Sequence, residues 1–358
     1  MIDRQQMSAR YEASRNDFLE AITAAGGALR HYRHPLTGPS GEPLFLDLGV
    51  LGNTQAKKLI FIASGTHGIE GYLGSELQTA LLSSALFEQF LCSNLIVFVH
   101  GVNPFGMAWH RRVNEHNVDL NRNFIDFSQQ LPFNEEYDLL SEAVNPIQFE
   151  PENIVEAKQK MTEFVEQHGV MRYIKALSGG QYHFPEGVQY GGQQAQWSTA
   201  RLNDIWDEYV PQKNLVLNID LHSGLGDRGE GVIMINGDDN ESRIQRVQGC
   251  WEGILLSPPP KADDFIMTGV LGHCLESKFP TIEVVAAVLE FGTEDMQQVA
   301  SAMIADNWLQ HHGDVDSDKG QRIKQQILDA FYIDDDHYRA QVYKRTEEVI
   351  RAALKLSI

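Results

Sequence analysis

The stretch LIFIASGTHGIEG, residues 59–71, joins an apolar run to a glycine-rich turn. Its first part, 59–63, is apolar at every position, which is typical of a strand buried on both faces of a sheet. The turn that follows places His67 and Glu70 three residues apart. A buried strand that ends in such a turn delivers these side chains to the carboxyl edge of a sheet, where α/β proteins bind ligands. The stretch therefore predicts an α/β fold with a functional site at this edge.

Histidine and glutamate together suit a borderline-soft cation such as zinc. A catalytic zinc site needs at least one more protein ligand and a position left open for water. Taken alone, an H-x-x-E pattern also fits an ordinary surface turn. The interpretation as half of a metal site therefore depends on residues elsewhere in the chain.

Length, composition and charge place limits on the function. The chain has 358 residues, of which 42% are hydrophobic and 22% charged, as in ordinary globular proteins. No apolar run reaches the ~18 residues that a membrane span needs. The formal net charge of −20 argues against a nucleic acid or an anionic membrane as partner, because both require a basic surface. Acid and amide side chains over residues 1–6 replace the apolar segment of a signal peptide, so we expect a cytoplasmic protein.

The three cysteines do not suggest a redox or metal function. Cys92, Cys250 and Cys274 are too widely spaced for a disulfide framework or a Cys-x-x-Cys zinc pattern. We expect them to be small buried thiols.

Short apolar runs alternate with helical patterns along the chain, which predicts an α/β architecture. Helices are predicted from about Ser8 to Ala25, after Glu70 as far as Phe87, and over the tail 336–358. The predicted strands are 44–48, 58–63, 95–100, 215–221, 231–235 and 284–291.

The segment from about 126 to 211 is more polar and contains glycine pairs around Tyr182 and Tyr190. Candidate site residues lie on both sides of this segment and have to meet in one cavity. We therefore predict an insertion over the active-site edge of the sheet and not a separate domain. The whole chain, 1–358, is predicted to form one domain.

A second polar segment follows the predicted strand 95–100. It contains Asn103-Pro104-Phe105-Gly106, then Arg111 and Arg112, then Asp119-Leu120-Asn121-Arg122-Asn123-Phe124. The last part offers a carboxylate, two amides and a guanidinium, and arginine is shaped for bidentate binding of a planar carboxylate. The alternative is an ordinary turn with solvated charges, since asparagine and aspartate favour turns.

A third segment ends the strand 215–221 with His222, directly before a Ser-Gly turn. His222 could supply the missing nitrogen ligand. Glu70 and His222 are 152 positions apart (222 minus 70), so the site would combine two ligands on a short spacer with one from a distant strand. The alternative is a hydrogen-bonded histidine of the core.

A fourth segment places Glu290 inside the otherwise apolar strand 284–291. Burial of a carboxylate is costly unless another group compensates its charge. Three explanations are open at this point: a strand-end glutamate in solvent, a salt bridge, or a general base beside a metal.

The order and content of these four segments resemble the zinc carboxypeptidase family, together with its succinylglutamate desuccinylase and aspartoacylase relatives. Members carry H-x-x-E, N-P-x-G, an arginine at a fixed distance before an N-R pair, a lone histidine, and a glutamate on a late strand. Here Arg112 precedes Asn121 by nine positions (121 minus 112), and the resemblance runs from about Leu59 to Thr293. It implies a three-layer α/β/α fold with a mixed, mostly parallel central sheet, in a bacterial branch of the superfamily.

The resemblance also implies a metal site. His67, Glu70 and His222 would bind one zinc ion, with water in the fourth position. Zinc is the chemical default, because such a donor set also accepts other transition metals. Asp119 resembles the carboxylate that accepts the second ring N–H of the first histidine and so fixes its tautomer.

The remaining roles concern the substrate. By resemblance, Arg112 would polarise the scissile carbonyl, Asn121 and Arg122 would hold a terminal carboxylate, and Glu290 would be the general base. Peptidases of the family also use a tyrosine that precedes the catalytic glutamate. The segment 261–285 contains no tyrosine, so the role is absent, or a tyrosine of the insertion fills it, or His273 lies there for another purpose.

We therefore expect a hydrolase that cleaves an amide bond next to a free carboxylate. A metallocarboxypeptidase acting on small peptides is the first hypothesis, and an N-acyl amino acid deacylase with the same metal site is the second. The third is a non-catalytic metal-binding protein, although the presence of the candidate ligands and base favours an enzyme.

Overall fold

The computed structural model of the protein describes residues 1–235, 241–254, 256 and 267–357. A seven-stranded sheet runs through the described residues in the order β1-β2-β4-β3-β5-β7-β6. At its centre β4, β3, β5 and β7 are parallel, whereas β1, β2 and β6 pair antiparallel at the edges. The strands are β1 (Ala28–Thr37), β2 (Pro43–Gly52), β3 (Lys58–Ser64), β4 (Asn94–His100), β5 (Leu215–Arg228), β6 (Gly231–Met234) and β7 (Glu283–Gly292).

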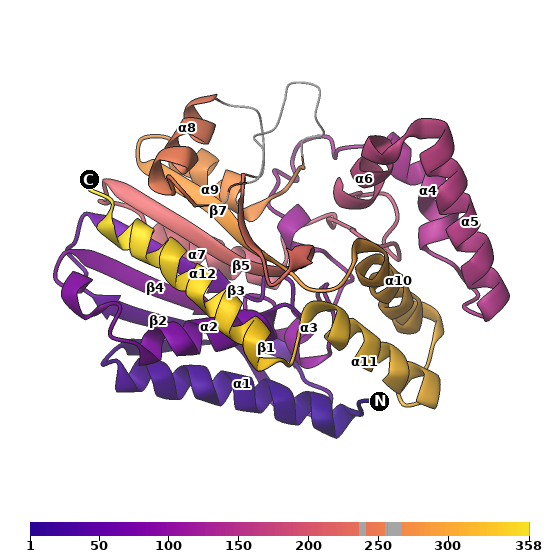
Figure 1. Ribbon diagram of the computed structural model, residues 1–358, viewed down its shortest axis with the longest axis horizontal. Helices are drawn as coiled ribbons and strands as arrows, with labels where there is room; N and C mark the ends of the chain where they lie inside the picture. Colours follow the sequence, from indigo (N-terminus) through magenta and orange to yellow (C-terminus); the bar gives the residue numbers. More distant parts are fainter. Residues whose placement is uncertain (236–240, 255, 257–266, 358) are drawn as a thin grey trace.

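Helices cover both faces of this sheet (Figure 1). They are α1 (Arg4–Ala24), α2 (Gly71–Ser83), α3 (Pro104–Ala108), α4 (Glu135–Val144), α5 (Pro151–His168), α6 (Val170–Ser178), α7 (Trp197–Tyr209), α8 (Glu241–Cys250), α9 (Leu271–Lys278), α10 (Met296–His312), α11 (Asp318–Phe331) and α12 (Asp336–Lys355). None of these helices combines the length and apolar composition that a membrane crossing requires. The predicted three-layer α/β/α fold with a mixed sheet is confirmed.

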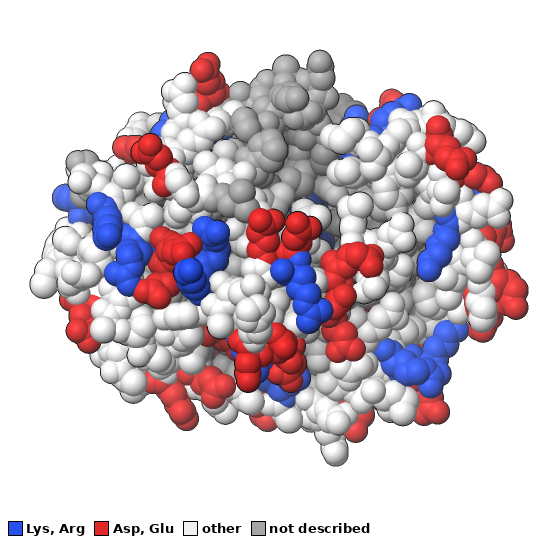
Figure 2. Space-filling model, viewed as in Figure 1, with Lys and Arg blue, Asp and Glu red and all other residues white. Residues whose placement is uncertain are grey.

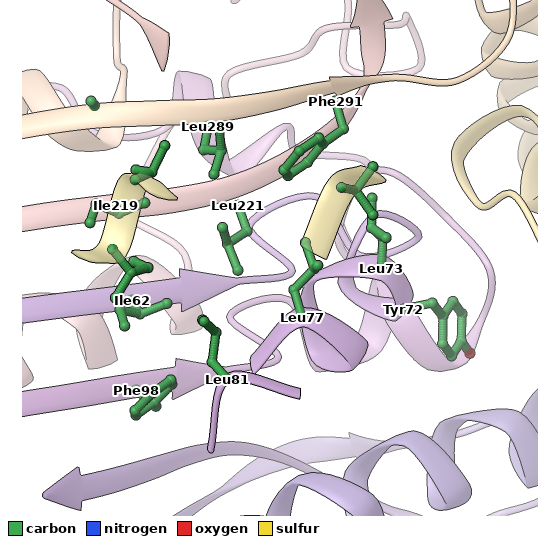
Figure 3. Close-up of a cluster of buried hydrophobic side chains, with 14 of the residues drawn as sticks. Ile62, Tyr72, Leu73, Leu77, Leu81, Phe98, Ile219, Leu221, Leu289 and Phe291 are labelled. Carbon is green, nitrogen blue, oxygen red and sulfur yellow. The ribbon is translucent and has the colours of Figure 1, made fainter. Parts of the chain in front are cut away.

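The core consists of an apolar layer on each face of the sheet. On one face, side chains of the central strands meet Leu73, Leu77 and Leu81 of α2 (Figure 3). On the other face, Trp206 of α7 and Leu275 of α9 pack against β3, β4 and β5. Because both faces are covered, β3 and β4 are buried along their whole length, which explains their continuous apolar sequences.

The predicted strands and helices are found, with ends shifted by a few residues, but the sequence analysis missed β1. This edge strand is mostly exposed and contains charged residues and Pro35, so it has no apolar run. Its register is set by antiparallel pairing with β2. Edge strands commonly carry proline and charged residues, because these hinder pairing with another chain.

Within the segment 126–211, helices α4, α5 and α6 form a small apolar cluster around Tyr137 and Phe164. Helix α7 belongs instead to the main core. Helices α4, α5 and α6 extend to one side of the sheet (Figure 1).

Lys58 fastens the start of β3 to the end of α12. Its side chain is buried, and Nζ donates to the carbonyls of Leu354 (3.0 Å) and Leu356 (2.7 Å). Burial lowers the pKa of Lys58 from 10.5 to about 8. The ammonium therefore supplies donors to carbonyls that α12 leaves without partners at its C-terminus.

We expect Lys58→Met to lower the free energy of unfolding by about 1–3 kcal/mol, because it leaves buried carbonyls unsatisfied. Denaturant unfolding at neutral pH measures this change. The matched control is Lys57→Met at the neighbouring exposed position, where we expect a change within about 0.5 kcal/mol. Equal stability of the two variants would contradict a structural role for Lys58.

Candidate metal centre

The loop 65–70 between β3 and α2 carries the first two candidate ligands and is held on two sides. The amides of residues 68 and 69 donate to the carbonyls of Arg112 (3.0 Å) and Arg111 (2.9 Å). The hydroxyl of Thr66 donates to the carboxylate of Asp220 on β5 (3.0 Å). The loop therefore has a fixed position relative to both neighbouring segments of the sheet edge.

Gly68 is required by the close approach of this loop to α3. A Cβ atom at Gly68 would lie 2.1 Å from the carbonyl carbon of Gly106 and 2.2 Å from the amide nitrogen of Met107. The amide of Gly106 in turn donates a hydrogen bond to Oδ1 of Asn103 (2.8 Å), the residue that caps the N-terminus of α3. The glycines of the two sequence segments thus allow their backbones to touch.

His67, Glu70 and His222 come together as the sequence predicts. One donor atom from each lies within 4.8 Å of the others, and all three side chains are buried. Nδ1 of His67 is 2.8 Å from Oε1 of Glu70, and Nδ1 of His222 is 2.9 Å from Oε2. The carboxylate of Glu70 therefore lies between the two imidazoles, and each histidine directs its Nδ1 atom to it.

The opposite nitrogen of each ring is held by a carboxylate. His67 donates Nε2–H to Asp119 (3.0 Å), the residue that the sequence predicted for this role. His222 donates Nε2–H to Asp220 (2.8 Å), a residue to which the sequence analysis assigned no role. The available signal was the alternation of a strand, which places Asp220 on the same face as His222. Both arrangements keep a proton on Nε2, so that Nδ1 is the ring atom that would bind a metal ion.

The electrostatics of the group favour a cation. Burial raises the pKa of Glu70, but His67 and His222 outweigh this effect. The pKa of the Glu70 carboxyl therefore lies below its ordinary range. Burial lowers the pKa of His222, but Asp220 and Glu70 outweigh it and raise the value well above 6.5. In the metal-free protein His222 therefore retains a second proton, which a divalent ion would displace on binding.

The residues fit a catalytic zinc ion. Two imidazole nitrogens and one carboxylate oxygen are a known donor set for such sites. Nδ1 of His67 is buried and forms no hydrogen bond of ordinary geometry, despite its proximity to Glu70. A metal ion would give this atom a partner.

Arg112 lies beside the cluster of His67, Glu70 and His222. Its Nη1 donates to Oδ2 of Asp119, and its Nε is 3.6 Å from Oε1 of Glu70. Burial would raise the pKa of Asp119, but Arg112 and His67 together hold it well below its ordinary range. Nη2 of Arg112 has no hydrogen bond to any described residue, so this atom can bind a further acceptor.

Glu290 lies beside the group on β7. It is the register partner of His222 on β5, and its Oε1 accepts a hydrogen bond from the amide of Leu225 (3.2 Å). Burial, and then the neighbouring Glu70, raise the pKa of Glu290 to about 8. Of the three explanations that the sequence allowed, exposure to solvent is wrong, since the residue is buried.

Asn121 and Arg122 are buried next to the group but are bound to the backbone. Oδ1 of Asn121 accepts from the amide of Leu271 (3.0 Å), at the start of α9. The two Nη atoms of Arg122 donate to the carbonyls of Asn121 (2.6 Å) and Ser178 (2.8 Å). Nε of Arg122 is buried without a hydrogen-bond partner among the described residues. Their role as a carboxylate clamp stays a prediction.

The tyrosines of the insertion have structural contacts. Tyr182 donates its hydroxyl to the carbonyl of Arg122 (2.6 Å), and Tyr190 belongs to an apolar cluster. A tyrosine that the sequence analysis did not consider is Tyr338 of α12. Its hydroxyl is buried without a hydrogen-bond partner among the described residues, and its pKa is raised by burial and by Glu290.

Residues 7–345 match the family model described as "Protein of unknown function (DUF2817)", so the chain belongs to this family. No curated protein matches the sequence.

Solved structures are similar to this chain at low sequence identity and with TM-scores below 0.5. A carboxypeptidase A from Helicoverpa armigera is 12% identical, with a TM-score of 0.45 over 95% of this chain and 72% of its own. A metallo-carboxypeptidase from Burkholderia cenocepacia is 11% identical, with a TM-score of 0.43 over 92% and 68%. An aspartoacylase family protein from Mesorhizobium loti is 14% identical, with a TM-score of 0.38 over 81% and 68%. These are the kinds of protein that the sequence motifs resemble, and the activity of this chain is inferred below from its own residues.

We expect Asp220→Asn to weaken zinc binding about 10- to 100-fold, because the carboxylate that orients His222 is lost. Competition with a chromophoric chelator measures the affinity. The control is Asp227→Asn at the exposed end of the same strand, which should bind zinc as the parent does. Parental affinity in Asp220→Asn would contradict the role of this carboxylate.

Proposed function

We propose that the protein is a metal-dependent hydrolase that cleaves an amide bond next to a free carboxylate, as a metallocarboxypeptidase does. The observation that carries this proposal is the position of Glu290. A buried carboxylate with a raised pKa stands on the strand next to His222, and the three candidate ligands lie beside it. A site that only stores metal has no need of such a group.

A bound zinc ion would supply a Lewis acid and would lower the pKa of a coordinated water from 15.7 towards about 7. In this proposal Glu290 accepts the proton of the attacking water. The same carboxyl can return the proton to the leaving nitrogen, since a pKa near the working pH suits both transfers. The bound cation would oppose the influence of Glu70 and would lower the pKa of Glu290 from its metal-free value.

Attack on an amide carbonyl builds negative charge on oxygen. We propose that Arg112 stabilises this charge. Its Nη2 has no hydrogen bond to any described residue, and Asp119 holds the guanidinium in place. A fixed donor at this oxygen contributes about 3 kcal/mol to catalysis, on the scale of an oxyanion-hole group. Burial and Asp119 keep the guanidinium in one orientation, so little reorganisation accompanies the reaction.

The substrate is proposed to carry a free carboxylate that Arg122 and Asn121 bind. Support comes from the buried Nε of Arg122, for which the described part of the chain provides no hydrogen-bond partner. A small peptide and an N-acyl amino acid both present a carboxylate next to an amide bond. The peptide is the primary proposal, and the acyl amino acid is the alternative that the substrate test resolves.

We expect Glu290→Gln to retain zinc and to lose about 100-fold or more of kcat, because the variant cannot accept a proton. Metal content by atomic spectroscopy and hydrolysis of the best substrate measure the two effects. The control is Glu283→Gln, at the exposed start of the same strand, which should behave as the parent does. Turnover by Glu290→Gln at the parental rate would refute its role as base.

A substrate panel tests the proposed reaction. Peptides with a free C-terminus, the same peptides with an amidated C-terminus, and N-acyl amino acids are incubated with the zinc-loaded protein. Hydrolysis of the free peptides alone supports a carboxypeptidase, whereas hydrolysis of the acyl amino acids alone supports a deacylase. Stoichiometric zinc without hydrolysis of any amide would support a metal-binding protein that is not an enzyme.

A further inference from the structure

A groove of about 860 Å³ lies between helices α1, α2, α11 and α12. None of His67, Glu70 and His222 lines it. In Figure 1, α1 and α12 lie on the same side of the sheet as α2. Sites for small organic molecules have volumes of about 300–1,000 Å³, so the groove has the size of a binding site.

The wall of the groove is largely apolar. Leu73 and Leu77 of α2 face it, together with Leu328, Val342 and Tyr343 from the C-terminal helices. Walls of this kind favour ligands with an apolar body, because burial of apolar surface contributes roughly 25 cal/mol per Å².

A cation and a carboxylate of this groove both contact the side chain of Tyr332. The guanidinium carbon of Arg10 lies 5.1 Å from the ring centroid of Tyr332 and 5.5 Å from that of Tyr72. The hydroxyl of Tyr332 donates to Oε1 of Glu76. Arg10 and Glu76 are therefore near each other, but no ion pair joins them in the part of the chain that the structure describes.

Both charged groups have unused hydrogen-bonding capacity. Oε2 of Glu76 is buried and has no hydrogen-bond partner among the residues that the structure describes, and burial raises the pKa of this carboxyl. Arg10 makes no hydrogen bond to any described residue. Arg339, the other cation of the groove, is already paired with Asp334 and Asp336. Buried polar groups without partners are costly, so a ligand that supplied partners would be stabilised.

We propose that this groove binds a small zwitterion, a free α-amino acid with an apolar side chain. Its carboxylate would bind Arg10, its ammonium would bind Oε2 of Glu76, and its side chain would pack on the apolar lining of the groove. Figure 2 shows that acidic and basic side chains lie close together over this face of the molecule. The site is separate from the candidate metal centre and does not depend on the proposed hydrolysis.

Calorimetric titration of the metal-free protein with L-leucine tests the site. We expect binding that Arg10→Gln and Glu76→Gln each weaken about tenfold or more, since each loses a charge-assisted hydrogen bond. Arg10→Lys should restore part of the affinity. The controls, Arg33→Gln and Glu12→Gln, remove one exposed charge of each sign outside the groove lining and should bind as the parent does. Thermal unfolding without ligand verifies that each variant is folded.

Altered ligands separate the three contacts. N-acetyl-leucine lacks the ammonium, leucinamide lacks the carboxylate, and glycine lacks the side chain, so each should bind more weakly than leucine. His222→Ala should leave leucine binding unchanged, because the groove does not include that residue. The proposal is overturned if the parent binds no apolar amino acid, or if folded Arg10→Gln and Glu76→Gln variants bind leucine as tightly as the parent. Loss of binding in His222→Ala alone would assign the ligand to the metal cluster instead.

Discussion

A single buried carboxylate, that of Glu70, faces two imidazoles, and the arrangement of the site depends on this contact. Both histidines direct Nδ1 to it, and the amide of Ser223 donates to Oε2. A buried charge of this kind is tolerated only when surrounding groups compensate it. The structure provides that compensation through His67 and His222, and through Arg112, whose Nε lies 3.6 Å from Oε1 of Glu70.

This network explains why the sheet and the loops have to be arranged as they are. Glu70 and His67 leave β3, Asp220 and His222 belong to β5, and Glu290 stands on β7, so three adjacent parallel strands contribute to one edge. The segment after β4 supplies the other side. Since each group satisfies its neighbours, a shift of one element would leave several buried polar atoms without partners.

The two sites that we propose share helix α2. The helix starts directly after Glu70, and residues 72–80 along it contribute to the lining of the groove. The residue before α2 thus belongs to a polar, buried centre, and one side of the helix belongs to a largely apolar groove. A rigid helix connects them, so a ligand in the groove would contact the element that positions a candidate metal ligand.

The sequence alone determined the fold class, the positions of most strands along the chain and the identity of the three clustered residues. The reason is that continuous apolar runs, glycine turns and histidine at strand ends are local patterns that persist in the folded chain. It did not reveal β1, whose exposed edge position removes the apolar pattern. It also left Asp220 without a role and the surroundings of Glu290 undecided, because both depend on which strands are neighbours. Only the tertiary structure placed β7 beside β5, brought Arg10 to the ring of Tyr332 and tied Arg122 to backbone carbonyls, since these contacts join residues far apart in the chain.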